Sequence, residues 1–281
     1  FIFFIRIRRE IIQLKERSKL SKDIDFISTQ KLITKIIYIQ ILSIFLKRFF
    51  RKLKIKKIYQ SMYYDNFGLA AGLASQKSEI LNSCVQHGGQ SKNNPAFGSW
   101  NNMPVRGYDF LPNKFLCWDE FSTLGINEWA NLTEKHSSEI IGYGWIDIWK
   151  HRIQPKDEVS VSKAVDKNHL RILVTLQPSV NLKQTYLFKV IKGNIKNIHW
   201  TIRAHPRQDN KDFLDLLNSD LIDVKNISIE SSKIPLPLLL QTSDLHVTFF
   251  SSSVFEAKLL GVKTVIVDQR GIDYFEPLIE E

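Results

Sequence analysis

Three consecutive serines and a nearby glutamate have the composition of a binding site for a phosphorylated ligand. Ser251, Ser252 and Ser253 follow the apolar stretch 245–250, and Glu256 falls in the first turn of the predicted helix that starts there. Serine hydroxyls and free N–H groups at a helix start bind anions of phosphate size, and a carboxylate one turn on can accept hydrogen bonds from ribose hydroxyls. The same residues also fit an ordinary capping box, in which a serine caps the helix and the glutamate completes the cap.

The stretch "TIRAHPR" places a histidine between two arginines where an apolar strand is predicted to end. Arg203, His205 and Arg207 would surround an anionic group there, while Pro206 fixes the backbone after the histidine. A histidine in this position can donate a hydrogen bond to a phosphate oxygen and stabilise a departing nucleotide. The alternative is a surface turn whose arginines are solvated.

The stretch "CVQHGGQ" provides a third candidate. Gln86 and His87 follow a predicted strand and precede Gly88 and Gly89. Glycines let a substrate approach the backbone closely, and a histidine that faces a cleft can act as a general base. The alternative is a histidine in a structural turn. The remaining histidines fall at helix, linker or strand positions and receive no role.

All three stretches follow segments that the sequence predicts to be strands of a parallel sheet. Short β-branched or aromatic runs alternate with segments of helical periodicity. Strands are expected over 54–64, 80–89, 113–119, 139–144, 170–178, 198–206, 227–230, 245–250 and 263–268. Alternating strands and helices with short connections indicate parallel sheets, which bind ligands at the carboxyl ends of their strands. The sequence therefore predicts an α/β protein with two Rossmann-like domains.

Two of the intervening helices carry further local signals. The helix expected over 66–79 contains Gly68 and Gly72, and this spacing predicts a helix that lies close against a sheet. The helix expected to end near residue 132 should be opened by Ser122 or Thr123, because hydroxyl residues cap helix N-termini.

Charge is concentrated in the N-terminal part of the chain. Residues 1–60 hold 16 Lys and Arg against 4 Asp and Glu, within a total of 39 against 29. Such a segment attracts phosphates, an anionic membrane face or nucleic acid. We expect four regions: a basic, partly helical segment over 1–54, a first Rossmann-like domain over 55–150, a polar linker over 151–168 and a second Rossmann-like domain over 169–281.

Composition excludes several classes of protein. The apolar run 36–46 is about half the roughly 20 residues that a membrane-spanning helix needs. Residues 31–57 predict an amphipathic basic helix and a strand, and this helix would lie either on a membrane surface or against its own domain.

Cys84 and Cys117 fit neither a disulfide framework nor a metal site, so a cytoplasmic location is expected. No metal-binding motif occurs, and no cofactor is predicted.

The motifs together resemble those of two-domain GT-B glycosyltransferases. They are most similar to bacterial surface-polysaccharide enzymes with an HP motif and a serine motif: polysialyltransferases, capsule Kdo transferases and teichoic-acid glycerophosphotransferases. His205-Pro206 matches the HP motif, Ser252-Ser253 matches the serine pair, and 256–268 resembles the E-A-x-x-x-G segment of donor domains. Gln86-His87-Gly88 resembles the histidine–glycine turn of the acceptor domain. The resemblance covers roughly residues 55–281.

The resemblance implies a metal-independent glycosyltransferase of capsule or surface polysaccharide biosynthesis. Its partners would be a nucleotide-sugar donor and a glycan acceptor, with peripheral contact to the anionic inner membrane face as a further expectation. His205, Ser252 and Ser253 would hold the donor phosphate, Glu256 the ribose, and His87 would be the base that activates the acceptor. The acidic motif that supplies the base in polysialyltransferases has no match, which leaves the base and the donor class open. The closing C-terminal helix of the fold has no match either, and we expect a fragment cut at both ends.

Two other functions remain open. A sugar-nucleotide 2-epimerase of the same fold would convert a nucleotide sugar without any acceptor. A non-catalytic module would use its basic N-terminus on a membrane or on nucleic acid. Nucleic acid is not an expected partner, because no basic motif interleaved with aromatic residues occurs.

Overall fold

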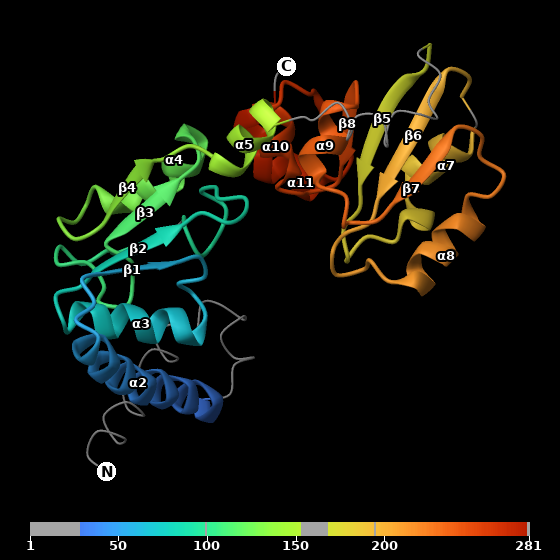
Figure 1. Cartoon of the computed structure of the whole chain (residues 1–281). Helices are drawn as coiled ribbons and strands as arrows, with labels where there is room; N and C mark the ends of the chain where they lie inside the picture. The colour runs from blue at the N-terminus through green and yellow to red at the C-terminus, as the bar shows by residue number, and fades with distance from the viewer. Residues whose placement is uncertain (1–28, 99, 153–167, 194, 280–281) are drawn as a thin grey trace. The chain divides into compact units, whose positions relative to one another are not determined.

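The computed structural model describes residues 29–98, 100–152, 168–193 and 195–279. The chain divides between Ile141 and Gly142 into two compact units (Figure 1). Each unit contains its own parallel β-sheet, which confirms the predicted α/β class.

The sheet of the first unit has four parallel strands in sequence order: β1 (Lys57–Gln60), β2 (Leu81–Val85), β3 (Lys114–Cys117) and β4 (Ser137–Ile140). The helices of this unit are α2 (Thr29–Lys52), α3 (Asn66–Gln76) and α4 (Glu120–Ala130). Helix α3 lies between α2 and the sheet (Figure 1). None of the helices in the described residues is long and apolar enough to cross a membrane.

Aromatic side chains fill the core of the first unit. Tyr63, Phe97 and Phe115 meet edge to face with ring centroids 5.6–6.3 Å apart. Trp129 of α4 packs on Phe115, and its indole N–H donates to the carbonyl of Phe97 at 2.7 Å. This packing joins α4 to β3 and to the loop before it, because such rings bury large apolar areas.

Aspartates, rather than hydroxyl residues, start both helices that follow β1 and β3. Asp65 accepts a hydrogen bond from the Gly68 N–H at 2.6 Å, and Asp119 accepts one from the Ser122 N–H at 2.9 Å. Helix α4 therefore begins at Glu120, because its capping residue is Asp119, three residues before Ser122.

The two glycines of α3 allow close contact with loops instead of strands. A Cβ atom on Gly68 would lie 2.3 Å from the Met62 carbonyl oxygen, and one on Gly72 would lie 2.4 Å from the Phe110 carbonyl oxygen. The predicted close approach is present, but the partner segments are the loops after β1 and before β3.

The sheet of the second unit has five parallel strands in the order β7-β6-β5-β8-β9. The strands are β5 (Leu170–Thr175), β6 (Ile198–Arg203), β7 (Ile227–Glu230), β8 (Leu245–Thr248) and β9 (Thr264–Ile266). The α-helices are α5 (Gly144–Arg152), α7 (Tyr186–Lys192), α8 (Lys211–Asp220), α9 (Leu236–Gln241), α10 (Ser253–Leu259) and α11 (Gln269–Phe275). Single 3₁₀ turns cover Leu182–Gln184 and Glu276–Leu278.

The central strands of this sheet are buried on both faces. Val174, Ile202 and Val247 lie side by side on three neighbouring strands and are 0–5% exposed. Leu173, the residue before Val174, lies on the opposite face and is 0% exposed. Apolar residues from α7, α8 and the loops complete this core. Burial on both faces explains why these strands read as continuous apolar runs in the sequence.

The division between the units differs from the predicted linker over 151–168. The predicted first domain extends to residue 150, whereas helix α5 belongs to the second unit. It packs on α9, where the Gln241 side chain donates to the carbonyl of Trp149 at 3.4 Å. Most of the predicted linker, 153–167, and the predicted segment up to residue 28 lie outside the described residues.

Candidate functional site

The strand order of the second unit reverses beside β5. Connections from β5 lead to β6 on one side, whereas β8 and β9 lie on the other side. In sheets of this topology, ligands bind where the order reverses, outside the carboxyl ends of the strands. Arg203 ends β6, and the Ser251–Ser253 stretch follows β8. Sequence and topology therefore place these residues on the same edge of one sheet.

Glu256 is held at this edge by a residue that sequence reasoning missed. The Tyr143 hydroxyl donates to Glu256 Oε1 at 2.9 Å. The other carboxylate oxygen, Oε2, is buried and accepts no hydrogen bond from any described residue. No local pattern could identify Tyr143, because it precedes Glu256 by 113 positions.

Burial determines the electrostatics of this pair. It raises the pKa of Glu256 above the ordinary value, while the Tyr143 hydrogen bond and the Arg203 charge act in the opposite direction. Burial also raises the pKa of Tyr143, and the Glu256 charge adds to that rise. Tyr143 is therefore a neutral hydrogen-bond donor at every pH at which the protein is handled.

Arg203 is fixed by the loop that follows β7. Its guanidinium donates to the carbonyls of Ser232 at 2.9 Å and Ile234 at 3.2 Å. Burial lowers the pKa of Arg203, and the charges of Glu256 and Asp209 partly restore it. Arg203, which was predicted to bind an anion, thus also holds the loop in place through hydrogen bonds. Its positive charge lowers the pKa of Glu256.

His205 is oriented as a neutral hydrogen-bond donor. Its Nδ1 accepts the backbone N–H of Arg207 at 3.1 Å, so the proton of the neutral ring lies on Nε2. Burial lowers the pKa of His205, and the charges of Arg207 and Arg203 lower it further. Pro206 and the Arg207 side chain are exposed in the turn. Donation from Nε2 to a phosphate oxygen stays a prediction for His205.

The three serines differ in what their hydroxyls contact. Ser253 is 4% exposed, and its Oγ lies 3.2 Å from Thr175 Oγ1 and 3.4 Å from His246 Nε2. The Ser251 hydroxyl accepts the Ser253 N–H at 3.2 Å, while Ser252 makes no side-chain cap. The capping-box alternative is therefore absent. Ser253 was predicted to bind the donor, but its hydroxyl is turned into the interior, which leaves Ser251 and Ser252 partly exposed.

Ser253 belongs to a buried polar cluster that the sequence did not indicate. His246 is fully buried, with Nδ1 3.0 Å from Thr264 Oγ1 and Nε2 3.0 Å from Thr175 Oγ1. Thr175 also donates to Thr248 at 2.9 Å. Burial lowers the pKa of His246 to about 3, so the ring is neutral under ordinary conditions. The cluster connects β5, β8, β9 and the start of α10.

In the first unit, Gln86 is a structural residue at the end of β2. It is 4% exposed, and its amide donates to Ser122 Oγ at 2.9 Å and to the Gly88 carbonyl at 3.0 Å. Its Oε1 accepts the Trp118 N–H at 2.7 Å. Gln86 was predicted to face the acceptor, but its full set of hydrogen bonds instead fixes the turn beside it.

His87 is the exposed residue of that turn. Its Nε2 lies 3.4 Å from the Tyr64 hydroxyl, and the two rings are 6.4 Å apart. A Cβ atom on Gly88 would meet no atom within 4 Å, so the backbone there is open to solvent. The Gly89 carbonyl accepts a hydrogen bond from Asn94 at 3.4 Å. An exposed imidazole beside open backbone can accept a proton from a bound hydroxyl group.

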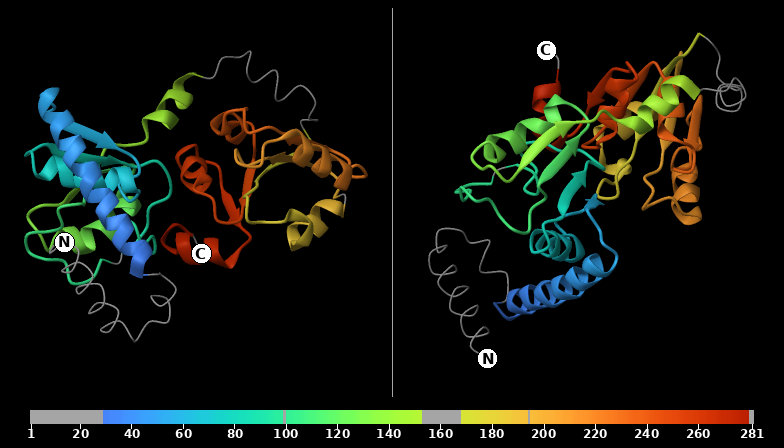
Figure 2. Two further views of the ribbon diagram at one scale, coloured as in Figure 1. Left: turned by 90° about the horizontal axis from the view of Figure 1, so that it is seen from below. Right: turned by 60° about the vertical axis from the view of Figure 1, so that its left-hand side comes forward.

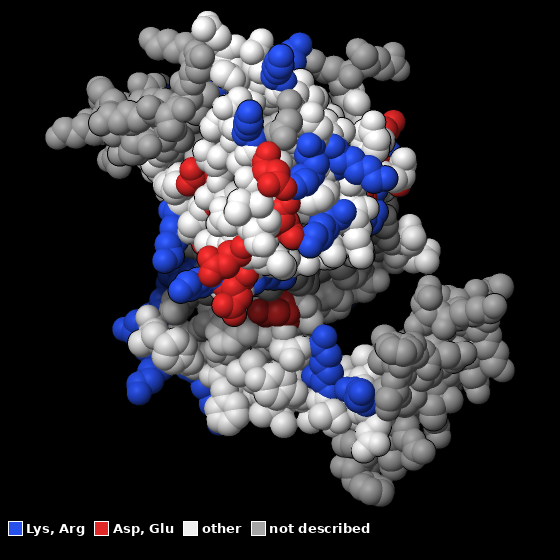
Figure 3. Space-filling model, turned by 90° about the vertical axis from the view of Figure 1, so that its right-hand side faces the viewer, with Lys and Arg blue, Asp and Glu red and all other residues white. Residues whose placement is uncertain are grey.

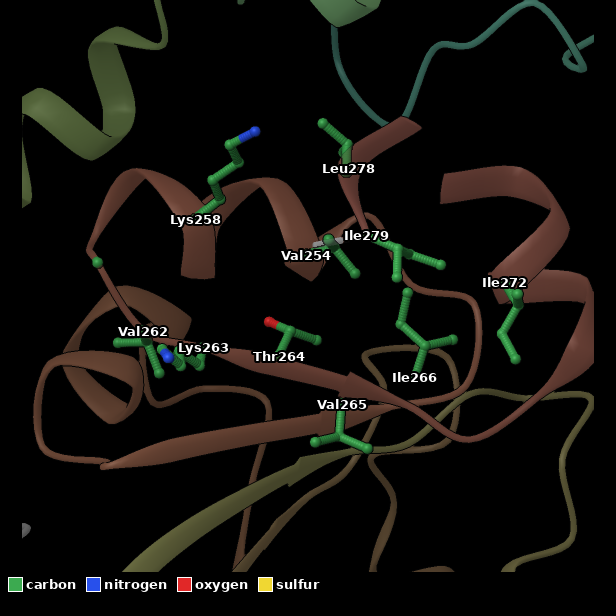
Figure 4. Close-up of a pocket in the computed structure, with 11 residues that line it drawn as sticks. Val254, Lys258, Val262, Lys263, Thr264, Val265, Ile266, Ile272, Leu278 and Ile279 are labelled. Carbon is green, nitrogen blue, oxygen red and sulfur yellow. The ribbon is translucent and has the colours of Figure 1, made fainter. Parts of the chain in front are cut away.

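A cavity of about 720 Å³ lies elsewhere in the second unit, between β9, α10 and the last residues of the described chain (Figure 4). Its lining is largely apolar, with Val254, Val265, Ile272 and Ile279 among the contributing side chains. Figure 4 shows Lys258 extending away from the apolar side chains. The residues predicted to do chemistry do not line this cavity. Within the described ranges, no group of three or more His, Cys, Asp or Glu residues could hold a metal ion.

No protein-family model and no curated protein sequence matches the chain. Staphylococcus aureus MnaA in complex with UDP is similar in structure, with a TM-score of 0.54 and 12% identity over 83% of this chain. The chain spans 62% of the length of that protein.

Two UDP-GlcNAc 2-epimerases are also similar to this chain in structure. The enzyme from Methanocaldococcus jannaschii has a TM-score of 0.51 and 18% identity, with 84% of this chain and 73% of that chain covered. The Neisseria meningitidis enzyme, solved with UDP-GlcNAc bound, has a TM-score of 0.54 and 15% identity, with 81% and 63% covered. The chain therefore consists of two Rossmann-like domains of the GT-B class, a fold that it shares with these epimerases.

Proposed function

We propose that this protein is a glycosyltransferase that moves a sugar from a nucleotide-activated donor to a glycan acceptor. The nucleotide would bind the second unit at the carboxyl edge of its sheet. A surface polysaccharide is the acceptor class that the sequence motifs favour. The observation that carries the proposal is the carboxylate of Glu256, which has one oxygen fixed by Tyr143 and the other buried without a hydrogen-bond donor among the described residues.

A buried carboxylate oxygen without a donor costs about 1–3 kcal/mol, and a ligand hydroxyl can remove this cost. Ribose supplies two adjacent hydroxyls, and Glu256 is fixed by Tyr143 so that its second oxygen can accept from one of them. On the same edge of the sheet, His205 carries its proton on Nε2 and can donate to a phosphate oxygen. The positive charge of Arg203 favours the same anion. Together these groups would stabilise the nucleotide as it leaves the sugar.

His87 is the candidate base on the acceptor side. Glycosyl transfer needs one group that takes the proton of the acceptor hydroxyl, and an exposed imidazole can do this. Asp65 and Asp119 follow β1 and β3, the strands on either side of β2, and both carboxylates are already engaged as helix caps. This supports the histidine as the base.

A second candidate, a sugar-nucleotide 2-epimerase, is favoured by the likeness to MnaA and to the two UDP-GlcNAc 2-epimerases. An epimerase would convert UDP-GlcNAc to its C2 epimer without any acceptor. Analysis of the products formed from UDP-GlcNAc, with and without an acceptor glycan, separates the two activities.

The nucleotide site can be tested by calorimetric titration of the full chain with UDP, CDP, CMP and GDP. We expect one nucleotide to bind selectively, and Glu256→Gln to weaken it by about 10- to 100-fold, as loss of a charge-assisted hydrogen bond implies. Tyr143→Phe should weaken nucleotide binding less, because this change removes only the hydrogen bond that fixes the Glu256 carboxylate. Glu276→Gln, at an exposed carboxylate of the same unit, is the matched control. Equal affinity in wild type and Glu256→Gln would refute the assignment of Glu256 to the ribose.

The base is tested by turnover in the presence of donor and acceptor. His87→Ala should abolish turnover and leave nucleotide affinity unchanged, because His87 belongs to the first unit. Normal turnover in this variant would remove His87 from the mechanism. Binding of all nucleotides with no turnover of any sugar nucleotide would instead support a non-catalytic binding module.

A further inference from the structure

Helix α2 presents an apolar stripe on its outer face. Tyr38, Ile41, Phe45 and Phe49 repeat at intervals of three or four residues, which places them on one side of the helix. Each is between 51% and 61% exposed. Four large apolar side chains in a row on a surface helix form a contiguous patch, and such patches mark interaction sites.

The opposite face of α2 is already used. Ile39, Ser43 and Phe50 are 1–9% exposed, and Phe50 belongs to a core cluster with Ala71 and Ala74 of α3. Both views of Figure 2 agree with Figure 1 in placing α3 beside α2. Packing on α3 therefore buries the inner face only, and the outer stripe stays exposed.

The charges around the outer stripe all have one sign. Lys31 and Lys35 precede the stripe and Arg48 and Lys52 lie at its end, and all four are exposed. Residues 29–64 contain nine Lys and Arg and no Asp or Glu. In contrast, residues 169–281 contain 13 basic and 13 acidic residues, and on the face of the second unit in Figure 3 the two kinds are intermixed. The positive potential is thus specific to the region of α2.

We propose that the outer face of α2 binds the surface of an anionic lipid bilayer. An interfacial helix has apolar residues on one face that enter the boundary of the acyl chains, and flanking lysines and arginines that contact anionic headgroups. Helix α2 has both features on the same face. Because its inner face is buried against α3, the helix would lie in the plane of the bilayer.

The test is co-sedimentation of the full chain with vesicles. One set contains equal parts of phosphatidylcholine and phosphatidylglycerol, and the other contains phosphatidylcholine alone. We expect binding to the anionic vesicles, weaker binding to the neutral ones, and a decrease as salt is raised. Absence of binding to anionic vesicles at low salt would overturn the proposal.

Substitutions on α2 test whether vesicle binding occurs through its outer face. Arg48→Gln combined with Lys52→Gln should weaken binding about 10-fold or more, and Phe45→Ser should weaken it about fivefold or more. The controls are Lys211→Gln and Tyr186→Ser, at exposed positions of the second unit; Tyr186 is 79% exposed. These changes should leave binding unaltered. Equal binding of wild type and the α2 variants would overturn the assignment to α2.

A site-specific label distinguishes membrane contact from self-association of the protein. Cys84 and Cys117 are 1% and 0% exposed, and burial raises the pKa of both thiols to about 12, so a new cysteine at position 45 can be labelled selectively. An environment-sensitive fluorophore on Phe45→Cys should shift to the blue on anionic vesicles, and one on Tyr186→Cys should not. A blue shift that instead follows protein concentration without vesicles would show a second copy of the chain as the partner and overturn the proposal.

Discussion

His246 illustrates how much the chemistry of a residue depends on its surroundings. The ring is fully buried, with both nitrogens within 3.0 Å of threonine hydroxyls. A neutral histidine fills this position well, because each nitrogen has a hydrogen-bond partner and no charge is buried. The Thr175 and Ser253 hydroxyls that it contacts belong to the end of β5 and the start of α10, next to the candidate nucleotide site.

Burial of His246 makes stability depend on pH. The unfolded chain binds a proton to this residue below about pH 6.5, whereas the folded chain binds it only near pH 3. Between these values the unfolded state holds more protons, so stability is lost as the pH falls. We expect the free energy of unfolding to decrease by up to about 1.4 kcal/mol per pH unit from this group. Urea unfolding from pH 7 to pH 4 would measure it.

Substitution isolates the contribution of that one histidine. His246→Gln should flatten the pH dependence relative to wild type, although it lowers stability at neutral pH. His151→Gln, at an exposed position of α5, should leave the slope unaltered. Identical slopes for wild type and His246→Gln would contradict this account of the acid sensitivity.

At the level of elements, α5 has the largest consequence for the candidate site. Gly144–Arg152 packs on α9, and the residue before it, Tyr143, donates to Glu256 of α10. A short segment that follows the first sheet in sequence thus completes the second unit. The carboxylate that would bind the ribose is positioned by this contact.

Helix α3 provides a test of close packing in the first unit. In Gly72→Ala the new methyl group would lie 2.4 Å from the Phe110 carbonyl oxygen, and a backbone atom cannot move aside easily. We expect the free energy of unfolding to fall by about 1–3 kcal/mol, as is typical of overpacking. This loss should appear as a lower midpoint temperature of thermal unfolding. Gly88→Ala is the control, because no atom lies within 4 Å of its Cβ position. A Gly72→Ala midpoint equal to wild type would show that α3 can shift away from the loop.

At the level of the whole molecule, the two units have separate cores and separate candidate roles. The buried residues of the first core lie between 63 and 130, and those of the second between 172 and 249. The groups that we propose to bind the nucleotide all belong to the second unit. The basic surface and the proposed base, His87, belong to the first. The excess positive charge of the chain is likewise confined to its N-terminal part.

This separation predicts how fragments will behave. A fragment of residues 142–281 should fold and bind the nucleotide with nearly the affinity of the full chain, because it contains Tyr143, Arg203, His205 and Glu256. A fragment of residues 169–281, the domain predicted from sequence, lacks Tyr143 and should bind more weakly. Circular dichroism and calorimetric titration would measure both. Equal affinities of two folded fragments would mean that Tyr143 does not contribute to the site.

Local patterns in the sequence predict both parallel sheets and the edge at which polar residues gather. Short apolar runs alternating with helical segments specify strand, helix and their order, because these periodicities are local. The same reasoning places Arg203 and His205 at the carboxyl edge of the sheet, because residues that follow buried strands fall there. It also places Glu256 near this edge, one turn into the helix after β8.

Which of these side chains are available to a ligand depends on contacts between segments that are far apart in the chain. The Tyr143–Glu256 contact joins residues 113 positions apart, and the burial of His246 depends on three strands and a helix. The inward turn of Ser253 and the engagement of Gln86 by Ser122 and Trp118 depend likewise on distant partners. Local pattern indicates which residues reach an edge, but hydrogen bonding and burial there arise from the packing of segments that the sequence keeps apart.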